Sequence, residues 1–136
     1  MKQLKIIPSD YICQLWDQVE HYFKRASGTG TDDYTVEQIK FLLVQGKQTL
    51  FVIMDGEKLI GTFTVEVIKY PNHCVAHTTT MGGKGLFDKD TVKQYEDWAR
   101  SQEVNKIRAF AQEAQARLYR MKMGLNMVTH VVEKTI

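Results

Sequence analysis

Hydrophobic residues recur with a helical period near the start of the chain, after a short apolar run that predicts a strand. That run spans residues 4–7 and ends at Pro8, and Ser9 and Asp10 offer side-chain oxygens that can cap a helix. The helix predicted after them carries apolar residues at helical spacing: Ile12, Leu15, Trp16, Val19, Tyr22 and Phe23. The pattern indicates a strand followed by an amphipathic helix.

A second helix is predicted after a polar stretch, residues 27–33, which has the composition of a loop. Thr35 and Gln38 have the spacing of a capping box, in which each side chain accepts a hydrogen bond from the other residue's backbone N–H. The apolar face of this helix consists of Val36, Ile39, Leu42 and Leu43. Gly46 is expected to end the helix, because glycine adopts the left-handed backbone conformation without a steric penalty.

The period changes to that of strands in the middle of the chain. Residues 50–54 form a compact apolar run that ends in an Asp-Gly pair, which is typical of tight hairpins. The return strand, residues 59–70, alternates apolar and polar side chains, and a turn at Pro71 leads into a further strand over residues 74–81. These segments predict an antiparallel three-strand meander.

The last third of the chain alternates between helical and strand patterns. Glycines gather in residues 82–85, which predict a loop, and a helix is expected after it. The apolar residues of that helix are Val92, Tyr95, Trp98 and Ala99. A strand over residues 106–111, a helix over 113–123 that Gly124 ends, and a last strand over 127–132 follow. The whole order predicts an α/β (α+β) fold in which a mixed sheet has helices on both faces.

Length and composition fit one globular domain over residues 1–136. The chain is 43% hydrophobic and 25% charged, and a domain of this size buries about two thirds of the surface that it exposes when unfolded. The 18 Lys and Arg against 16 Asp and Glu give a net charge of only +2, so nucleic-acid binding is not expected. Cys13 and Cys74 lack the spacing of a zinc site or a disulfide framework, which favours a reducing compartment.

No apolar run approaches the ~18 residues of a membrane-spanning helix. The apolar part of residues 1–8 is too short for a signal peptide. We therefore expect a cytoplasmic protein with no membrane partner.

The order of elements and three local motifs resemble the GNAT N-acetyltransferase superfamily over nearly the whole chain. One motif, similar to the pyrophosphate-binding loop of that superfamily, consists of Met81, Gly82, Gly83, Lys84, Gly85 and Leu86. The Trp-Ala-Arg segment at residues 98–100 and the Ala-Arg-Leu-Tyr segment at residues 116–119 are similar to its third and fourth helices. The short chain and its ending over residues 131–134 look most like the small GNAT-like proteins of tailed bacteriophages.

The glycine loop has a physical rationale. Glycines between a strand and a helix let an anion approach backbone N–H groups, and Lys84 could add a charge-assisted contact. The resemblance implies that this anion is the pyrophosphate of acetyl-CoA. The loop departs from the superfamily pattern, because Thr80 or Gly82 stands where Arg or Gln is usual, and Phe87 at the expected helix start would crowd a pyrophosphate. A turn that binds nothing is the alternative explanation.

Acetyl transfer from a thioester to an amine needs a base for the amine and an acid for the leaving thiolate. The resemblance implies that Tyr119 is the acid, although it lies one residue farther from Gly124 than the superfamily pattern has it. Glu66 and His77, on neighbouring strands, are the candidates for the base. A tyrosine that packs on the sheet is the alternative reading of Tyr119.

The two candidate bases also have structural explanations. Glu66 shares with Thr62 and Thr64 the polar face of its strand, and such a face is often solvated. His77 precedes Thr78–Thr80, an unusually polar end for a central strand, and could be a surface or hydrogen-bonded core histidine. His73 and His77 would lie ~13 Å apart in one strand, too far to share one ion, so no metal site is expected.

Two functions from different classes remain. The first is an acetyl-CoA-dependent N-acetyltransferase that acts on a small amine or a protein amine. The second is a non-catalytic GNAT-fold protein that docks on other proteins, for example in a phage particle or on a host protein. A homo-oligomer formed through the last strand is compatible with either function.

Overall fold

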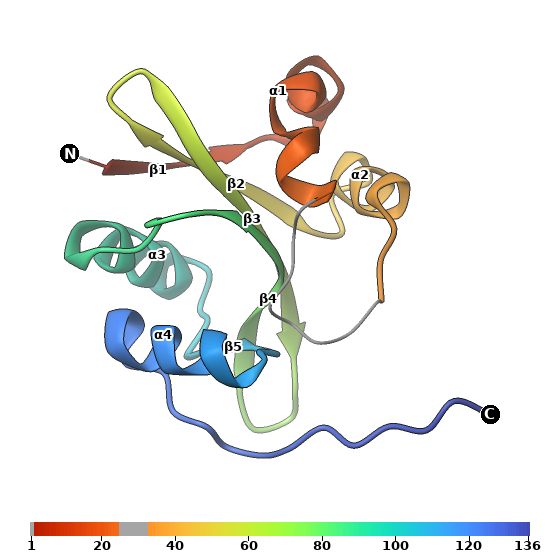
Figure 1. The fold of residues 1–136 in the computed structure, drawn as a ribbon, viewed down its shortest axis with the longest axis vertical. Coiled ribbons are helices and arrows are strands. Elements are labelled where there is room, and N and C mark those ends of the chain that lie inside the picture. Colours follow the sequence, from red (N-terminus) through yellow and green to blue (C-terminus); the bar gives the residue numbers. More distant parts are fainter. Residues whose placement is uncertain (1, 25–32) are drawn as a thin grey trace.

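The computed structural model describes residues 2–24 and 33–136, and within those ranges it contains five strands and four α-helices (Figure 1). In chain order they are β1 (Lys2–Ile7), a 3-10 turn (Ser9–Tyr11), α1 (Ile12–Lys24), α2 (Val36–Val44), β2 (Thr49–Asp55), β3 (Lys58–Lys69), β4 (Cys74–Gly83), α3 (Lys89–Ser101), β5 (Lys106–Ala109) and α4 (Glu113–Met123). Most of the loop predicted at 27–33 lies outside the described residues. No helix within the described ranges has the length and hydrophobicity needed to cross a membrane.

A mixed sheet with the strand order β1-β2-β3-β4-β5 forms the centre of the fold. Strands β1 to β4 are antiparallel neighbours, and β5 runs parallel to β4. The meander β2-β3-β4 confirms the sequence prediction, and its first hairpin closes at the Asp-Gly pair, where Asp55 pairs with Lys58. The N-terminal strand extends the meander beside β2.

Helices cover both faces of this sheet, as the order of elements predicted. Leu50 and Val52 of β2 pack with α1 and α2 in one core cluster. Phe51 and Ile53 pack with residues of α3 in the other cluster. Figure 1 shows α1 and α2 on one side of the sheet and α3 and α4 on the other. Because neighbouring residues of β2 face two different cores, this strand is hydrophobic along almost its whole length.

The ends of the helices agree with the predicted caps in three of four cases, among them the end of α2 at Gly46, which has φ +73°. The Thr35 side chain accepts from the Gln38 N–H at 3.2 Å, and the Gln38 side chain accepts from the Thr35 N–H at 2.9 Å. Gly124 ends α4 with φ +72°. The predicted cap by Ser9 or Asp10 is wrong, because both residues lie in the 3-10 turn, which starts after Pro8 and has no side-chain cap bond.

The last predicted strand is not formed. Residues 124–136 contain no helix or strand, and the apolar side chains from Met127 onward are exposed, among them Val131 at 59% and Val132 at 91%. Alternation of apolar and polar side chains predicts which face of a sheet each residue would occupy. A strand forms only if its backbone N–H and C=O groups also find hydrogen-bond partners. No backbone hydrogen bond joins residues 126–136 to another segment of the described chain.

Gly83 and Gly46 offer a matched pair of substitutions that tests the close packing of β4 on β3. Both have positive φ, but a Cβ on Gly83 would lie 2.5 Å from the Ile60 carbonyl oxygen, whereas a Cβ on Gly46 meets nothing within 4 Å. Urea unfolding should show a loss of about 1–2 kcal/mol for Gly46→Ala, the cost of backbone strain alone. Gly83→Ala should lose more than about 3 kcal/mol. Equal losses would contradict this account of Gly83.

Candidate functional site

The sheet opens where β4 leaves β5. The two strands pair only from Val75 opposite Lys106 to Thr78 opposite Ala109, while β4 continues beside β3 as far as Gly83. The β3–β4 register shifts at this point, because Val65 pairs with Thr78 and Thr64 with Thr80. Thr79 is therefore the extra residue of a β-bulge, which bends β4. Beyond it, one edge of β4 has no strand partner within the described residues.

A chain of buried hydroxyl groups surrounds this bulge. The Thr64 hydroxyl lies 2.5 Å from that of Thr80 and 2.6 Å from that of Thr79. Thr79 donates to the Gln48 side-chain oxygen at 2.8 Å. Each hydroxyl has one proton, so Thr79 accepts from Thr64, and Thr64 accepts from Thr80. The network ties the bulge to the residue that precedes β2.

The threonines of β3 correct one expectation. Thr62 and Thr64 are fully buried, whereas the polar face that they share was expected to be solvated. The reason is tertiary, since α1 and α2 cover this face of the sheet. The polar end of β4 at residues 78–80 was the sequence signal for a special site here, but nothing in the sequence indicated Gln48.

Glu66 and His77 lie directly opposite each other on β3 and β4, on the face covered by α1 and α2. Both are partly buried, and the His77 ring meets Phe110 edge to face with 4.7 Å between the ring centroids. Burial lowers the pKa of His77, and the Arg108 guanidinium also lowers it, although the carboxylates of Glu66 and Asp33 act in the opposite direction. His77 is therefore neutral at pH 7 and can accept a proton.

Tyr119 lies on the other face of the sheet. It is partly buried, and its hydroxyl donates to the Met81 sulfur at 3.6 Å, so it connects α4 to the part of β4 that has parted from β5. Burial raises the pKa of Tyr119, which keeps the hydroxyl protonated and suits a proton donor. The structure thus places Tyr119 on one face of the sheet, beside Met81, and the Glu66–His77 pair on the other face, where His77 is still opposite Arg108 of β5.

The glycines of the predicted loop have structural roles of their own. Gly82 and Gly83 are the last residues of β4, not loop residues, and they pair with Thr62 and Gly61. A Cβ on Gly82 would lie 2.5 Å from the Tyr22 carbonyl oxygen, so α1 requires a glycine here. Gly85, with φ +62°, makes the actual turn. Close packing within the chain therefore accounts for the first two glycines without a ligand.

The α3 N-terminus is capped by the chain itself. The Asp88 carboxylate accepts from the Thr91 N–H at 2.9 Å, and this hydrogen bond is the main reason that the pKa of Asp88 is lowered. The Lys2 ammonium donates to the Gly85 carbonyl and lies 3.9 Å from the Asp88 carboxylate. Lys2 and the exposed Lys84 bring two ammonium groups to the loop, and their charge would favour a bound pyrophosphate. The negative charge of the Asp88 carboxylate would repel such a ligand.

Leu86 and Phe87 turn into the core between the glycine turn and α3. Both are buried, and the Phe87 ring lies 5.4 Å from that of Phe63. The expectation that Phe87 stands at the helix start and crowds a pyrophosphate is wrong, because α3 begins two residues later at Lys89. The side chain of Leu86 faces the core, so this residue could meet a ligand only through its backbone.

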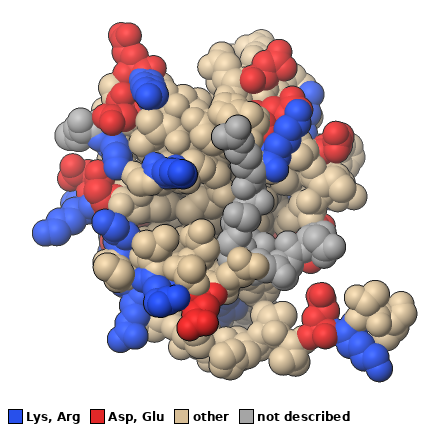
Figure 2. Space-filling model, in the orientation of Figure 1, with Lys and Arg blue, Asp and Glu red and all other residues tan. Residues whose placement is uncertain are grey.

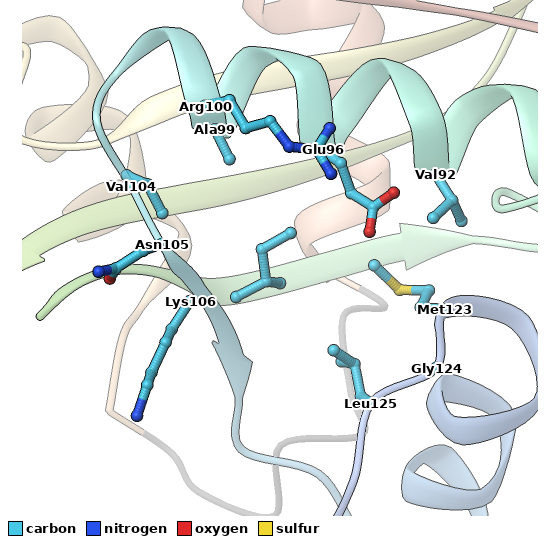
Figure 3. Close-up of a pocket in the computed structure, with 11 residues that line it drawn as sticks. Val92, Glu96, Ala99, Arg100, Val104, Asn105, Lys106, Met123, Gly124 and Leu125 are labelled. Atoms are coloured by element: carbon cyan, nitrogen blue, oxygen red, sulfur yellow. The ribbon is translucent and has the colours of Figure 1, made fainter.

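A pocket of about 240 Å³ opens elsewhere, between α3, β5 and α4 (Figure 3). Figure 3 shows the Glu96 side chain extending from α3 toward it, with Met123 and Leu125 on the side of α4. Tyr119, Glu66 and His77 do not line it. This pocket is therefore distinct from the opening at Thr79.

Neither the face drawn in Figure 2 nor the described titratable residues add another candidate site. Lys and Arg are interspersed with Asp and Glu on the face that Figure 2 shows. Among the described residues, no group of three or more His, Cys, Asp and Glu side chains could hold a metal ion.

Comparisons with known proteins identify the fold. No family model matches the sequence, and no curated protein does. Solved structures are similar, among them an aminoglycoside acetyltransferase from an uncultured soil metagenomic sample, in complex with sisomicin (13% identity, TM-score 0.69, 99% of this chain and 95% of that one). A GCN5-related N-acetyltransferase from Ralstonia eutropha JMP134 (15%, 0.64, 99% and 99%) and a predicted acetyltransferase from Clostridium acetobutylicum with acetyl-CoA (12%, 0.60, 99% and 96%) are also similar. The chain has the fold of the GNAT acetyltransferases.

Two isosteric substitutions test the buried hydroxyl chain. Thr79→Val removes the link between Thr64 and Gln48, and it should cost about 1–3 kcal/mol of unfolding free energy because buried polar groups lose their partners. Thr62→Val is the matched control, since the Thr62 hydroxyl is buried and has no hydrogen-bond partner among the described residues. Chemical denaturation should show this variant to be unchanged or more stable by up to about 1 kcal/mol. A loss of unfolding free energy in Thr62→Val as large as that in Thr79→Val would contradict this account of the two hydroxyls.

The pH dependence of stability tests the burial of His77. Its pKa in the folded protein lies below the unfolded value of 6.5, so its contribution to stability is present above pH 6.5 and is lost as the pH falls through the lowered pKa. Denaturation curves should therefore show a smaller loss of stability below pH 6.5 for His77→Gln than for the parent protein. His130→Gln, in the exposed C-terminal segment, is the control variant. An identical pH dependence of parent and His77→Gln would contradict this assignment.

Proposed function

We propose that the chain is an N-acetyltransferase that transfers an acetyl group from acetyl-CoA to an amine. The observation that carries the proposal is the parting of β4 from β5 at Thr79, with a protonated Tyr119 on one face of the sheet and a neutral His77, the cross-strand neighbour of Glu66, on the other face. An acid and a base on two sides of one opening suit a transfer in which one group gains a proton and another loses one. The shared fold with acetyltransferases supports the same function.

The proposed roles follow from the protonation states. Bound acetyl-CoA would supply a thioester carbonyl that an amine can attack. His77, next to Glu66 on the ladder, takes the proton that the amine loses as the new C–N bond forms. Tyr119 gives its proton to the thiolate that leaves as the C–S bond breaks, and solvent restores both residues. In this proposal, a substrate bound where β4 parts from β5 at Thr79 is reached by Tyr119 from one face of the sheet and by His77 from the other.

The segment Met81–Leu86 is the proposed binding site for the pyrophosphate. Lys84 is exposed at the turn and would supply a charge-assisted contact, and the backbone of Gly85 would face the ligand. The N-terminus of α3 would attract an anion, but the Asp88 carboxylate already places a negative charge there. Asp88 therefore reduces the affinity of this site for a pyrophosphate.

A non-catalytic docking protein is the second candidate, and the Asp88 cap is the observation that favours it. A helix N-terminus that is neutralised from within the chain has no need of a ligand. In this proposal the fold serves as a scaffold that binds another protein, in a phage particle or on a host protein. Binding of acetyl-CoA distinguishes the two candidates.

Calorimetric titration of acetyl-CoA at low salt tests the loop. Saturable binding is expected, and Lys84→Ala should weaken it on the order of tenfold through the lost charged contact. Asp88→Asn should strengthen it, because asparagine keeps the helix cap but removes the negative charge. Lys47→Ala, an exposed lysine after α2, is the charge-matched control and should leave binding unchanged. Absence of binding in the parent protein and in Asp88→Asn would refute the enzyme and leave the docking role.

Thiol release with acetyl-CoA and a panel of amines tests the catalytic roles. An aminoglycoside, an amino sugar and a peptide amine cover the main acceptor classes. Tyr119→Phe should lower the rate about 100-fold and leave the affinity for acetyl-CoA unchanged, because the ring and its packing remain while the proton donor is lost. A full rate in Tyr119→Phe would exclude this tyrosine as the acid.

A further inference from the structure

Three polar side chains form a row across β3, β4 and β5. Glu66 pairs with His77 in the antiparallel ladder, and His77 pairs with Arg108 in the parallel ladder, so the three residues lie side by side on one face of the sheet. All three side chains are partly buried. The row therefore presents a carboxylate, a neutral imidazole and a guanidinium in that order.

The two charged members of the row have no charged partner in the described part of the chain. The ion pairs found there involve neither Glu66 nor Arg108. Arg108 lies instead 5.7 Å from the centre of the Tyr70 ring, and an aromatic contact of this kind leaves the N–H donors of the guanidinium available. Partly buried charges that lack a partner favour a ligand of complementary charge.

Charges of opposite sign gather at the two ends of the row. Burial raises the pKa of Tyr34, and the carboxylates of Glu66 and Asp33 raise it further, so both carboxylates lie near this one ring. At the other end, Lys106 precedes Arg108 by two residues on β5, and residues two apart in a strand share a face. The face is therefore negative on the side of β3 and positive on the side of β5.

Two aromatic side chains border the row and are open to solvent. The Phe110 ring, which meets His77 edge to face, is 37% exposed, and Tyr70, beside Arg108, is 43% exposed. Exposed rings next to polar groups can bind a ligand that combines an apolar part with a polar part.

We infer that this row is the acceptor site and that it binds a free amino acid with an apolar side chain, its amine at Glu66 and His77 and its carboxylate on Arg108. The inference rests on the proposed acetyl transfer, in which His77 takes the proton of the amine. The charges of Glu66 and Arg108 cancel, as do those of an amino acid. Neighbouring strands are roughly 4.8 Å apart, which suits the short distance between an amine and its own carboxylate.

Arg108 gives the site its selectivity. A guanidinium binds a carboxylate through two parallel hydrogen bonds, a geometry that an uncharged amide does not reproduce. An amine on a sugar or within a peptide has no acid group beside it, so it would leave Arg108 without a partner. The site therefore favours free amino acids over other amines.

Calorimetric titration with L-phenylalanine and L-phenylalaninamide, run with and without coenzyme A, tests this site. The parent protein should bind the amino acid about tenfold more tightly than its amide. Arg108→Gln should weaken the binding of phenylalanine about tenfold. The same variant should bind the amide as well as the parent does or better, because a cation that repels the charged amide is gone, and this binding also shows that the variant is folded. Arg120→Gln, at an exposed position of α4, is the control and should change neither affinity.

Glu66→Gln should weaken both ligands to a similar degree, because both carry the amine. Equal affinity of the parent protein for the two ligands, or no binding of phenylalanine with or without coenzyme A, would overturn the inference. Thiol release from acetyl-CoA separates it from the proposed function. Phenylalanine that binds through Arg108 but releases no thiol would refute the acetyl transfer and leave the amino acid site in place. Thiol release with sugar or peptide amines but not with phenylalanine would support the enzyme and overturn this site.

Discussion

The shape of this structure depends on β4, which is paired with β3 over a longer stretch than with β5. On one side β4 follows β3 to Gly83, and on the other it follows β5 only to Thr78. The extra residue Thr79 lies where β4 loses its pairing with β5, and a bulge of this kind bends the strand. The hydroxyl chain from Thr80 to Gln48 fixes that residue in a buried position, where a loss of hydrogen bonds would be costly.

This constraint links the fold to the proposed chemistry. In the proposed mechanism, the parting of the strands lets His77 and Tyr119, which lie on opposite faces of the sheet, act on one substrate. The same constraint leaves β5 as a short edge strand. The opening and the unpaired edge are therefore two consequences of one parting of strands.

The elements were predictable because their signals are local. The capping box at Thr35, the Asp-Gly hairpin and the stop at Gly124 each depend on a few adjacent residues, and all three are confirmed. The site was predictable only as a set of candidates. The register that sets Glu66 opposite His77, the burial of Thr64, and the place of Gln48 depend on which strands and helices meet.

The sequence by itself determined the order of helices and strands as far as α4, the three-strand meander and the residue types available for acid–base chemistry, because periodicity and turn residues act over short distances. Only the tertiary structure decided that Gly82 and Gly83 belong to β4, that Asp88 caps α3, and that residues 127–132 are unpaired. Each of these depends on a contact between segments far apart in the chain, and a strand forms only where another backbone accepts its hydrogen bonds.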